Sequence, residues 1–554
     1  MQPLVIKDWQ KGIANSPHEG FGLMRNVDID AFPGAVKVQK AMTTLTPISY
    51  TGTFTADDTT DIMTTATAPI TGTAVTVSNS GGALPTGLSA STTYFVINVS
   101  GTTFKLATTL ANALSSTAID ITGNGTGTQT VTTVPMGTIT HQVYDASETR
   151  KYHLDSNGRV WYNSSTLTTV RLVHGNTLTN THGNGLAMFI PSNAGAVYLF
   201  VFRDNAIDVA NVSTVSVNNP TWSNAWKTMN TSAGTANSHE ALLGQDNIIY
   251  FCDGRYVGSI MEVAAAIFDP ANAATYTYNN QALDLPVQEI AQCLEEQGIN
   301  LLIGGNKLDK VYPWDRISDS FGIPLQVPEY SIKKLENMGG VVYIFAGTNG
   351  NIYQTPGTYV KHFVKLPDAV ANNSSTLQAT VVTWGGVGSF GGKLLVGAGV
   401  LTSGNSGVYS IKPDGTVTID NIPSTGSTNV TAIVANDEYY TIGYAGGIDV
   451  VTTSRYSSYQ TVIQSALYRV GTKTTKAKYS TLEVQIADPA TTGNIRVSYR
   501  RDTTSSFTTL ATFSADSSAT SFRDAEIGLT DLENLQVQVE MDGNIQLVEV
   551  RLIP

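Results

Sequence analysis

The segment Tyr152–Tyr162, YHLDSNGRVWY, contains a short apolar run, a turn rich in Asp, Asn and Gly, and a second short apolar run. Short β-branched or aromatic runs bounded by turn residues predict the two strands of a hairpin. The dipeptide Asn157-Gly158 can adopt the positive φ angles that tight hairpin turns require. The same pattern recurs in Val197–Val209, Ile248–Ile260, Ile299–Val311, Val341–Tyr353, Lys393–Ile411 and Glu438–Val450.

The spacing of these hairpins predicts a β-propeller. Their second runs begin about every 48 residues, inside the range of roughly 40–50 residues that is typical of propeller blades. A single hairpin is marginal in water, whereas hairpins stacked radially bury both faces and expose only short edges. The sequence therefore predicts an all-β protein with a β-propeller-like core of about seven blades. A large β-sandwich with loosely spaced hairpins is the alternative fold.

Changes of composition divide the chain into four segments. The first is an N-terminal arm whose Pro33-Gly34 turn predicts a hairpin that completes the core. The second nearly lacks charge, and its hairpin Tyr94–Leu106 indicates an inserted small β-sandwich. The third carries the repeats, with short helices expected only at Glu262–Phe268 and Val287–Gln297. The fourth alternates apolar and polar residues and predicts a C-terminal β-sandwich. The segments span residues 1–44, 45–135, 136–456 and 457–554.

The composition argues against nucleic-acid grooves and favours contacts with other proteins. The chain of 554 residues has a net charge of −12, and only 14% of its residues are charged. No Lys/Arg run stands out, as a nucleic-acid groove would require. Neutral polar surfaces cost less to bury against partners than charged ones. We expect Cys252 and Cys293, which lie in apolar stretches, to be buried inert thiols. Without an apolar leader or span, the chain is expected to be soluble and made in a cytoplasm.

Several short motifs suggest chemistry, but each has a structural alternative. Gly386–Gly391 matches G-x-G-x-x-G, yet the strand-like residues that follow argue against a nucleotide site, which needs a helix there. His174 and His182 lie in a Thr/Asn-rich stretch and are expected to be solvated, with a metal pair as the alternative. Gly404–Gly407 lacks the spacing of a nucleophile elbow and predicts a hairpin loop.

The acidic residues give equally weak signals. Asp57, Asp58 and Asp61, like Asp28 with Asp30, do not follow the spacing of an EF-hand loop. Propeller glycosidases need paired carboxylates. Asp155–Trp161 and Thr348–Tyr353 resemble the sialidase Asp box only at the glycine and aromatic positions. The sequence therefore predicts no catalytic residues, no cofactor and no metal site, and a protein that is not an enzyme.

Three parts of the chain resemble tail proteins of tailed bacteriophages. The first part, Gly22–Asp30 with Pro33-Gly34-Ala35, resembles the opening of tail or neck propeller proteins. The second part, Leu84–Leu88 with Thr92–Ala107, is similar to a small β-module of virion proteins. The third part, Gly493–Arg500, is similar to a terminal sandwich in such proteins. Among short-tailed phages the resemblance best fits the tail nozzle, a propeller-containing protein that forms a six-fold tube below an adaptor ring.

The resemblance implies a structural virion protein of the phage tail, made in the host cytoplasm. It implies a nozzle or tail-tube subunit in a homo-oligomer, with a hexamer favoured, that contacts an adaptor and other tail or neck proteins. DNA would pass through a central channel only as cargo during ejection, and an acidic lumen would let it slide because phosphate binding depends on Lys and Arg. The alternatives are a receptor- or carbohydrate-binding tail protein that contacts the host surface, and a propeller glycosidase.

Overall fold

The protein is described by a computed structural model of the chain. The described residues are 2–13, 21–30, 34–47, 50–145, 150–164, 169–174, 184–192, 196–213, 220, 222–233, 237–264, 266–347, 350–366, 380–400, 406–426, 428–436, 438–487, 492–515 and 522–554.

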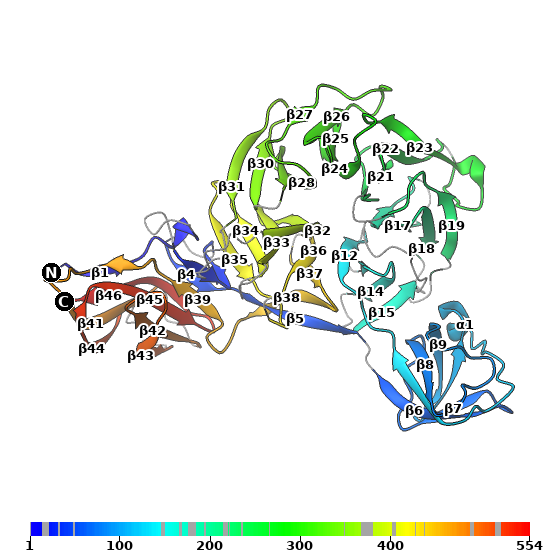
Figure 1. Cartoon of the computed structure of the whole chain (residues 1–554), viewed down its shortest axis with the longest axis horizontal. Coiled ribbons are helices and arrows are strands. Elements are labelled where there is room, and N and C mark those ends of the chain that lie inside the picture. The colour runs from blue at the N-terminus through cyan, green and yellow to red at the C-terminus, as the bar shows by residue number, and fades with distance from the viewer. Residues whose placement is uncertain are drawn as a thin grey trace.

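The centre of the molecule is a β-propeller in which seven antiparallel sheets of four strands surround a common axis (Figure 1). Blades 1 to 3 are β12 (Ile139–Tyr144), β13 (Arg150–Asp155), β14 (Val160–Ser164), β15 (Thr169–His174); β16 (Gly185–Phe189), β17 (Tyr198–Arg203), β18 (Ala206–Asn211), β19 (Trp222–Thr228); and β20 (Ala241–Leu243), β21 (Ile249–Asp253), β22 (Tyr256–Glu262), β23 (Tyr276–Asp284). Blades 4 and 5 are β24 (Ala291–Gln297), β25 (Asn300–Gly305), β26 (Lys310–Trp314), β27 (Leu325–Gln326); and β28 (Ile332–Met338), β29 (Val341–Ala346), β30 (Asn351–Thr355), β31 (Lys361–Lys365). Blades 6 and 7 are β32 (Thr380–Phe390), β33 (Lys393–Val400), β34 (Gly407–Ile411), β35 (Val417–Asn421); and β36 (Val430–Ala435), β37 (Tyr440–Tyr444), β38 (Gly447–Arg455), β5 (Lys40–Pro47).

The seven hairpins found in the sequence are the second and third strands of the seven blades, so the predicted propeller is confirmed. These two strands lie in the middle of each sheet and pack against the neighbouring blades on both faces. They are therefore apolar along most of their length: all five residues of Ile249–Asp253 are buried.

The helix expected at Val287–Gln297 is wrong, because Ala291–Gln297 forms β24, the first strand of blade 4. Its residues include the good helix formers Ala, Leu, Glu and Gln, but pairing with β25 and burial between blades override that weak preference. In the second segment expected to be helical, Glu262 is the last residue of β22, and the described residues 263, 264 and 266–268 that follow are turn and coil.

The ring is closed by a strand from the N-terminal arm. β5 pairs antiparallel with β38, with Leu45 opposite Ile448 and Met42 opposite Val451. A strand from one end of the chain thus completes a blade by pairing with residues more than 400 positions later. With this pairing, blade 7 has four strands, as the other blades do.

The inserted module is a closed barrel of six strands, which corrects the sandwich predicted for residues 45–135. The strands follow the order β10-β7-β6-β11-β8-β9 around the barrel, and each pairs on both sides, so that no edge is exposed. Phe54, Met63 and Phe104 fill its core. The elements are β6 (Thr51–Asp57), β7 (Ile62–Thr65), β8 (Ala74–Ser80), β9 (Tyr94–Ser100), β10 (Thr103–Ala107), β11 (Thr128–Thr133) and the helix α1 (Leu110–Leu114).

The C-terminal segment folds as a β-sandwich that also takes in most of the arm. Leu482 and Val484 of one sheet pack with Val537 and Val539 of the other, and Trp9 of the arm joins this core. One sheet contains β1 (Leu4–Ile6), β3 (Val27–Asp28), β4 (Val36–Val38), β46 (Gln546–Ile553), β41 (Ala477–Ile486) and β44 (Phe522–Leu532). The other contains β2 (Leu23–Arg25), β39 (Thr461–Gln464), β40 (Tyr468–Arg469), β45 (Asn534–Met541), β42 (Asn494–Arg500) and β43 (Thr508–Ser514).

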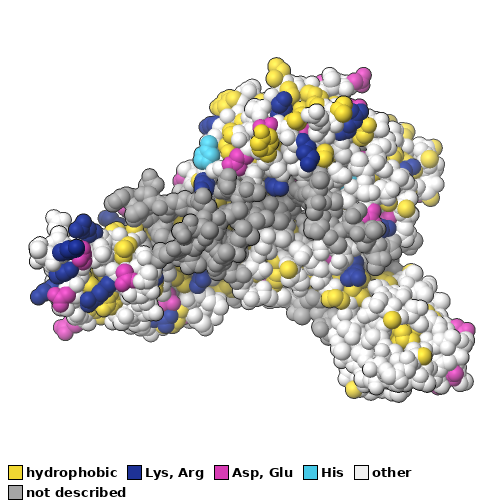
Figure 2. Space-filling view, in the orientation of Figure 1, with side chains coloured by type: hydrophobic (Ala, Val, Ile, Leu, Met, Phe, Trp, Pro, Cys, Tyr) yellow, Lys and Arg dark blue, Asp and Glu magenta, His cyan; other side chains and the backbone are white. Residues whose placement is uncertain are grey.

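The sandwich and the barrel project from different sides of the ring, with both termini at the tip of the sandwich (Figure 1). Figure 2 shows charged side chains gathered over the sandwich, while the visible face of the barrel is almost free of them. In the described part of the chain, none of the helices has the length and apolar character needed to cross a membrane.

Candidate functional site

The two faces of the ring differ in the turns that they carry. In a four-stranded antiparallel blade, the turns between strands one and two and between strands three and four lie at the same end. We call the ring face that carries these turns face one, and the other the opposite face. In blade 4, face one receives the β24–β25 turn and the long loop 315–324 between β26 and β27.

Face one carries a group of exposed apolar side chains on blades 4 and 5. The exposed fractions of Ile299, Ile317, Ile323 and Tyr359 are 77%, 89%, 88% and 55%. Single exposed apolar residues are ordinary, but several on adjacent loops mark an interaction surface. We call these four residues the apolar patch. Figure 2 shows hydrophobic side chains at the surface over the upper part of the ring, where blades 4 and 5 lie in Figure 1.

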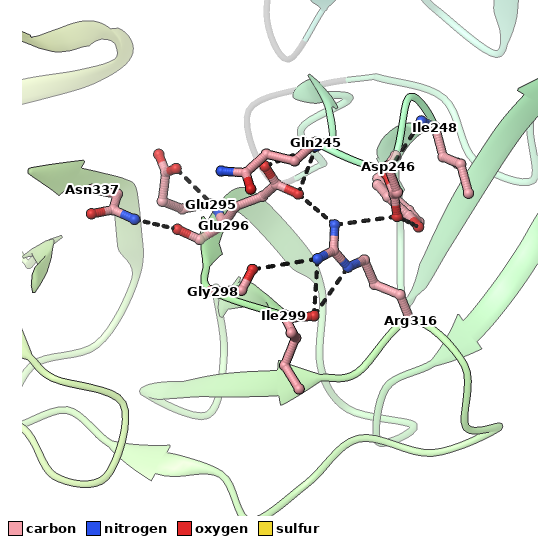
Figure 3. Close-up of polar contacts among 10 residues, drawn as sticks. Gln245, Asp246, Ile248, Glu295, Glu296, Gly298, Ile299, Arg316 and Asn337 are labelled. Atoms are coloured by element: carbon pink, nitrogen blue, oxygen red, sulfur yellow. Dashed lines mark hydrogen bonds and ion pairs between the residues drawn. The ribbon is translucent and has the colours of Figure 1, made fainter. Parts of the chain in front are cut away.

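Arg316 braces the loop that carries half of the patch (Figure 3). Its guanidinium pairs with Glu296 of β24, and its Nη1 lies 3.2 Å from Asp246 Oδ2 in the first turn of blade 3. Its Nη2 donates to the carbonyl oxygen of Ile299 at 2.9 Å. The carboxylate of Glu296 also accepts the backbone N–H of Gln245 at 3.0 Å.

The network therefore joins blade 3 to blade 4 and holds the loop 315–324 in place. Asn337 of β28 extends it to blade 5 by donating to the carbonyl oxygen of Glu296 at 2.6 Å. Ile317 follows Arg316 directly, and Arg316 itself has a φ of 67°, a left-handed conformation that is uncommon for a residue with a side chain. A surface loop held in this way loses little conformational entropy when it binds a partner.

We expect Arg316→Ala to release the loop 315–324. The variant leaves the carboxylate of Glu296, 11% exposed, without its cation, so the free energy of unfolding should fall by about 2 kcal/mol. Hydrogen exchange should show faster exchange of the loop amides. Arg255→Ala is the matched control, because the pair of Arg255 with Asp284 lies in solvent. Equal effects of the two variants on stability and exchange would contradict the bracing role.

A hollow of about 580 Å³ opens beside the patch, between the face-one loops of blades 4 and 5. Its wall combines apolar side chains with amide and hydroxyl groups. The ring of Phe321 packs edge-on against Tyr312, with 4.9 Å between the ring centroids, and so has a fixed orientation. The lining includes Asn300, Ser320, Phe321, Ile323, Leu325 and Thr358.

A second polar cluster lies on the first strands of blades 3 to 5, which run nearest the ring centre (Figure 1). Lys334 of β28 forms an ion pair with Glu240, which directly precedes β20. Burial alone would lower the pKa of Lys334, but Glu240, Glu336 and Glu295 together hold it above its usual value. Burial, followed by the charge of Glu336, raises the pKa of Glu295 to about 8. One ammonium thus serves three carboxyl groups, and burial favours the protonated form of Glu295.

His141 of β12, in blade 1, is close enough to the same cluster to be affected by the charge of Lys334. Burial, and then the charge of Lys334, lowers the pKa of His141 to about 3, so the imidazole is neutral. Burial likewise raises the pKa values of Glu240 and Glu336. The cluster links blades by charge and is poorly suited to binding an anion.

Buried carboxylates elsewhere in the ring close turns on the opposite face. Asp155 Oδ1 accepts the backbone N–H groups of Asn157 and Arg159 at 2.9 and 3.0 Å, and Oδ2 accepts the indole N–H of Trp161 at 2.9 Å. Glu289 accepts the N–H of Lys307 at 2.8 Å in the same way. The likeness of Asp155–Trp161 to an Asp box thus comes from a capped hairpin turn. In the second such segment, Thr348 lies outside the described residues.

Asp155→Ala should lower the free energy of unfolding by about 3 kcal/mol. The side chain is fully buried, and its removal leaves several donors without a partner. Asp57→Ala is the control, because Asp57 caps an exposed turn of the barrel through Thr59 and Thr60. Urea denaturation measures both. A loss no greater for Asp155→Ala than for Asp57→Ala would contradict the role of the buried cap.

The histidine predicted to be solvated is buried. His174 is 4% exposed, its Nε2 lies 2.7 Å from Asp208 Oδ2, and its ring stacks on Trp222 at 4.0 Å. The interpretation of His174 as a solvated loop residue is therefore wrong, because His174 is the last residue of β15. Burial lowers the pKa of His174 although Asp208 acts in the opposite sense. Its proposed partner His182 lies outside the described residues.

The remaining motifs lie in strands and turns. Gly386–Gly391 runs from β32 into the turn before β33. Asp30 pairs with Lys393 and Lys412, and Asp61 accepts the N–H of Ile121 at 2.9 Å. Gly404 lies outside the described residues.

The two cysteines are buried and free, as predicted, and burial raises their pKa values well above the usual range. In the described ranges, no group of three or more His, Cys, Asp or Glu side chains could hold a metal ion.

Comparison with known proteins gives similarity of structure only. No family model and no curated protein matches the chain. The computationally designed Ika8 protein aligns with a TM-score of 0.35 and 12% identity, over 68% of this chain and 98% of that protein. YCF48 bound to D1 peptide aligns with a TM-score of 0.39 and 9% identity, over 58% of this chain and 94% of that protein.

Proposed function

We propose that the protein is a structural subunit of a bacteriophage tail, a nozzle or tail-tube subunit that assembles with copies of itself into a ring around a channel. The observation that carries the proposal is the apolar patch on the braced loops of blades 4 and 5. Its isoleucines are almost fully exposed in the single chain, and a protein that works as a monomer gains nothing from fixing them there. The resemblance of the arm, the insert and the C-terminal segment to phage tail proteins gives the kind of assembly.

The use of the polar groups supports a role without catalysis. Asp155 and Glu289 are occupied with turn donors, and Glu296 is occupied with Arg316. Lys334 and its carboxylates tie the inner strands together. These groups give the ring rigidity, which suits a subunit of a tube.

The proposed partners are other copies of the chain, favoured as a hexamer, an adaptor and other tail or neck proteins. DNA is a passing cargo in this proposal. With a net charge of −12 and a low content of Lys and Arg, the assembled subunit would bind phosphates weakly.

Imaging of virions tests the proposal. A gold-labelled antibody against the barrel, which projects from the ring, should mark a position on the tail axis below the capsid. Label at the ends of side fibres would favour a receptor-binding protein, and absence of label from virions would contradict the proposal.

A receptor- or carbohydrate-binding tail protein is the second candidate, and the hollow beside Phe321 favours it. A fixed aromatic ring beside amide and hydroxyl groups suits a sugar ring. Binding of host-surface oligosaccharides that Phe321→Ala abolishes would support this candidate. Binding that survives the substitution, or no binding, would count against it.

A further inference from the structure

We propose that the apolar patch on face one receives the basic end of the C-terminal sandwich of a second copy of the same chain. We call Arg469, Lys473, Lys476 and Lys478 the basic end; they lie at the end of β40, in the connection from β40 to β41, and at the start of β41. The inference rests on the proposed assembly into a ring, and it names the two surfaces that meet there.

The charge of the patch identifies its partner as basic. The loop 315–324 contains three charged residues, Asp315, Arg316 and Asp319. The positive charge of Arg316 is directed inward, where it pairs with Glu296 and Asp246. Asp315 and Asp319 are exposed, so the loop presents two negative charges to solvent, one just before Ile317 and one between Ile317 and Ile323. A partner that covers the isoleucines must therefore bring cations to the rim of the contact.

The basic end has the complementary charge. Residues 450–482 contain five Lys or Arg residues and no Asp or Glu. Arg469, Lys473 and Lys478 are exposed, and Lys476 is half-buried, 3.1 Å from Glu533 Oε2. Glu533 lies close to Lys473 and Arg469 as well, so three cations share this carboxylate. A positive charge remains to be neutralised by another surface.

A second copy of the chain is the occupant because one chain carries both surfaces at separate places. β26 and β27 lie on the ring, whereas β41 lies at the far tip of the sandwich (Figure 1). The two surfaces are too far apart to meet within one chain. A contact between unlike surfaces of identical subunits repeats from copy to copy, and it closes into a ring when the rotation between neighbours fits.

The test compares matched surface variants of the full chain by native mass spectrometry and sedimentation equilibrium. Ile317→Lys combined with Ile323→Lys should raise the dissociation constant at least about 100-fold, because it removes two buried side chains and adds repulsion. Lys473→Glu combined with Arg469→Glu should also dissociate the oligomer. Val287→Lys is the control, since Val287 is 83% exposed on the opposite face and should have no effect.

Two further variants test the contact itself. Asp319→Lys and Lys473→Glu should each weaken the oligomer, and their combination should restore it. Because both native cysteines are buried, Asp319→Cys with Lys473→Cys should give chains linked end to end by a bismaleimide, whereas either change alone should not.

The outcomes separate this inference from the proposed function. An oligomer that withstands the patch or basic-end variants would overturn the assigned contact and leave the ring standing. A wild-type chain that stays monomeric at micromolar concentration would overturn both.

Discussion

Lys334→Met is expected to lower the free energy of unfolding by about 3 kcal/mol at pH 8, since removing one partner leaves buried carboxylates without a cation. The side chain of Glu240 is only 6% exposed and depends on Lys334 for its charge. Lys334 keeps 15% of its side-chain surface exposed, so water reaches the cluster. The expected loss of stability is therefore at the lower end of the range observed when one partner of a buried ion pair is removed. Urea denaturation, with hydrogen exchange of β28 to assign the transition to the propeller, measures the effect.

The loss should be smaller at pH 5 than at pH 8. The pKa of Glu295 is about 8 in the folded protein, above its ordinary value, so the folded state holds more protons than the unfolded state between these values. Stability therefore falls as the pH rises through that window, and removal of the ammonium steepens the fall. The second substitution Glu240→Gln should restore much of the loss of Lys334→Met. A loss equal at both pH values, or no rescue, would contradict the electrostatic role of the cluster.

Lys151→Met is expected to raise the free energy of unfolding by about 2 kcal/mol at pH 7. Lys151 of β13 is 2% exposed, and its Nζ donates to Thr441 Oγ1 at 2.9 Å and lies 4.5 Å from the ring centre of Tyr439. Burial lowers the pKa of Lys151 to about 8, and a shift of that size from the ordinary value costs roughly 3 kcal/mol. Loss of the hydrogen bond to Thr441 offsets about 1 kcal/mol of the gain.

The advantage of Lys151→Met should shrink as the pH rises. Above pH 8 the folded wild type loses the proton of Lys151, whereas the unfolded chain keeps it to about pH 10.4. The wild type is therefore stabilised as the pH rises through this window, and the variant lacks that gain. Denaturation at pH 7 and pH 9.5 measures the difference. A variant less stable than the wild type at pH 7, or a difference that does not change with pH, would contradict the account of Lys151.

The sequence predicts the middle of each blade well and its margins poorly. The second and third strands are buried between neighbouring blades, and their apolar runs and Gly/Asn/Asp turns are visible locally. The first strands carry polar residues, as in β24, whose composition favours a helix. Strands β1, β2 and β4 pair with partners from the other end of the chain, as Leu4 does with Leu552, and no local pattern indicates such pairs. The barrel was predicted as a sandwich because alternation gives strands but not their closure.

The candidate site was missed for a related reason. Arg316 is one arginine in a polar loop, and its partners Asp246 and Glu296 come from turns and strands 20 or more residues away. Lys334 and Glu336 alternate along β28, which could have indicated a polar inner strand if that strand had been recognised. The exposed Ile317 and Ile323 were visible in the sequence, but only the fold brings them next to Ile299 and Tyr359.

Image averages of the purified protein test the central claim most directly. The account predicts closed rings of identical subunits with an open centre and six-fold symmetry, in which the tip of each sandwich touches the propeller of its neighbour. Single propellers at micromolar concentration, or three-fold particles without a channel, would contradict it.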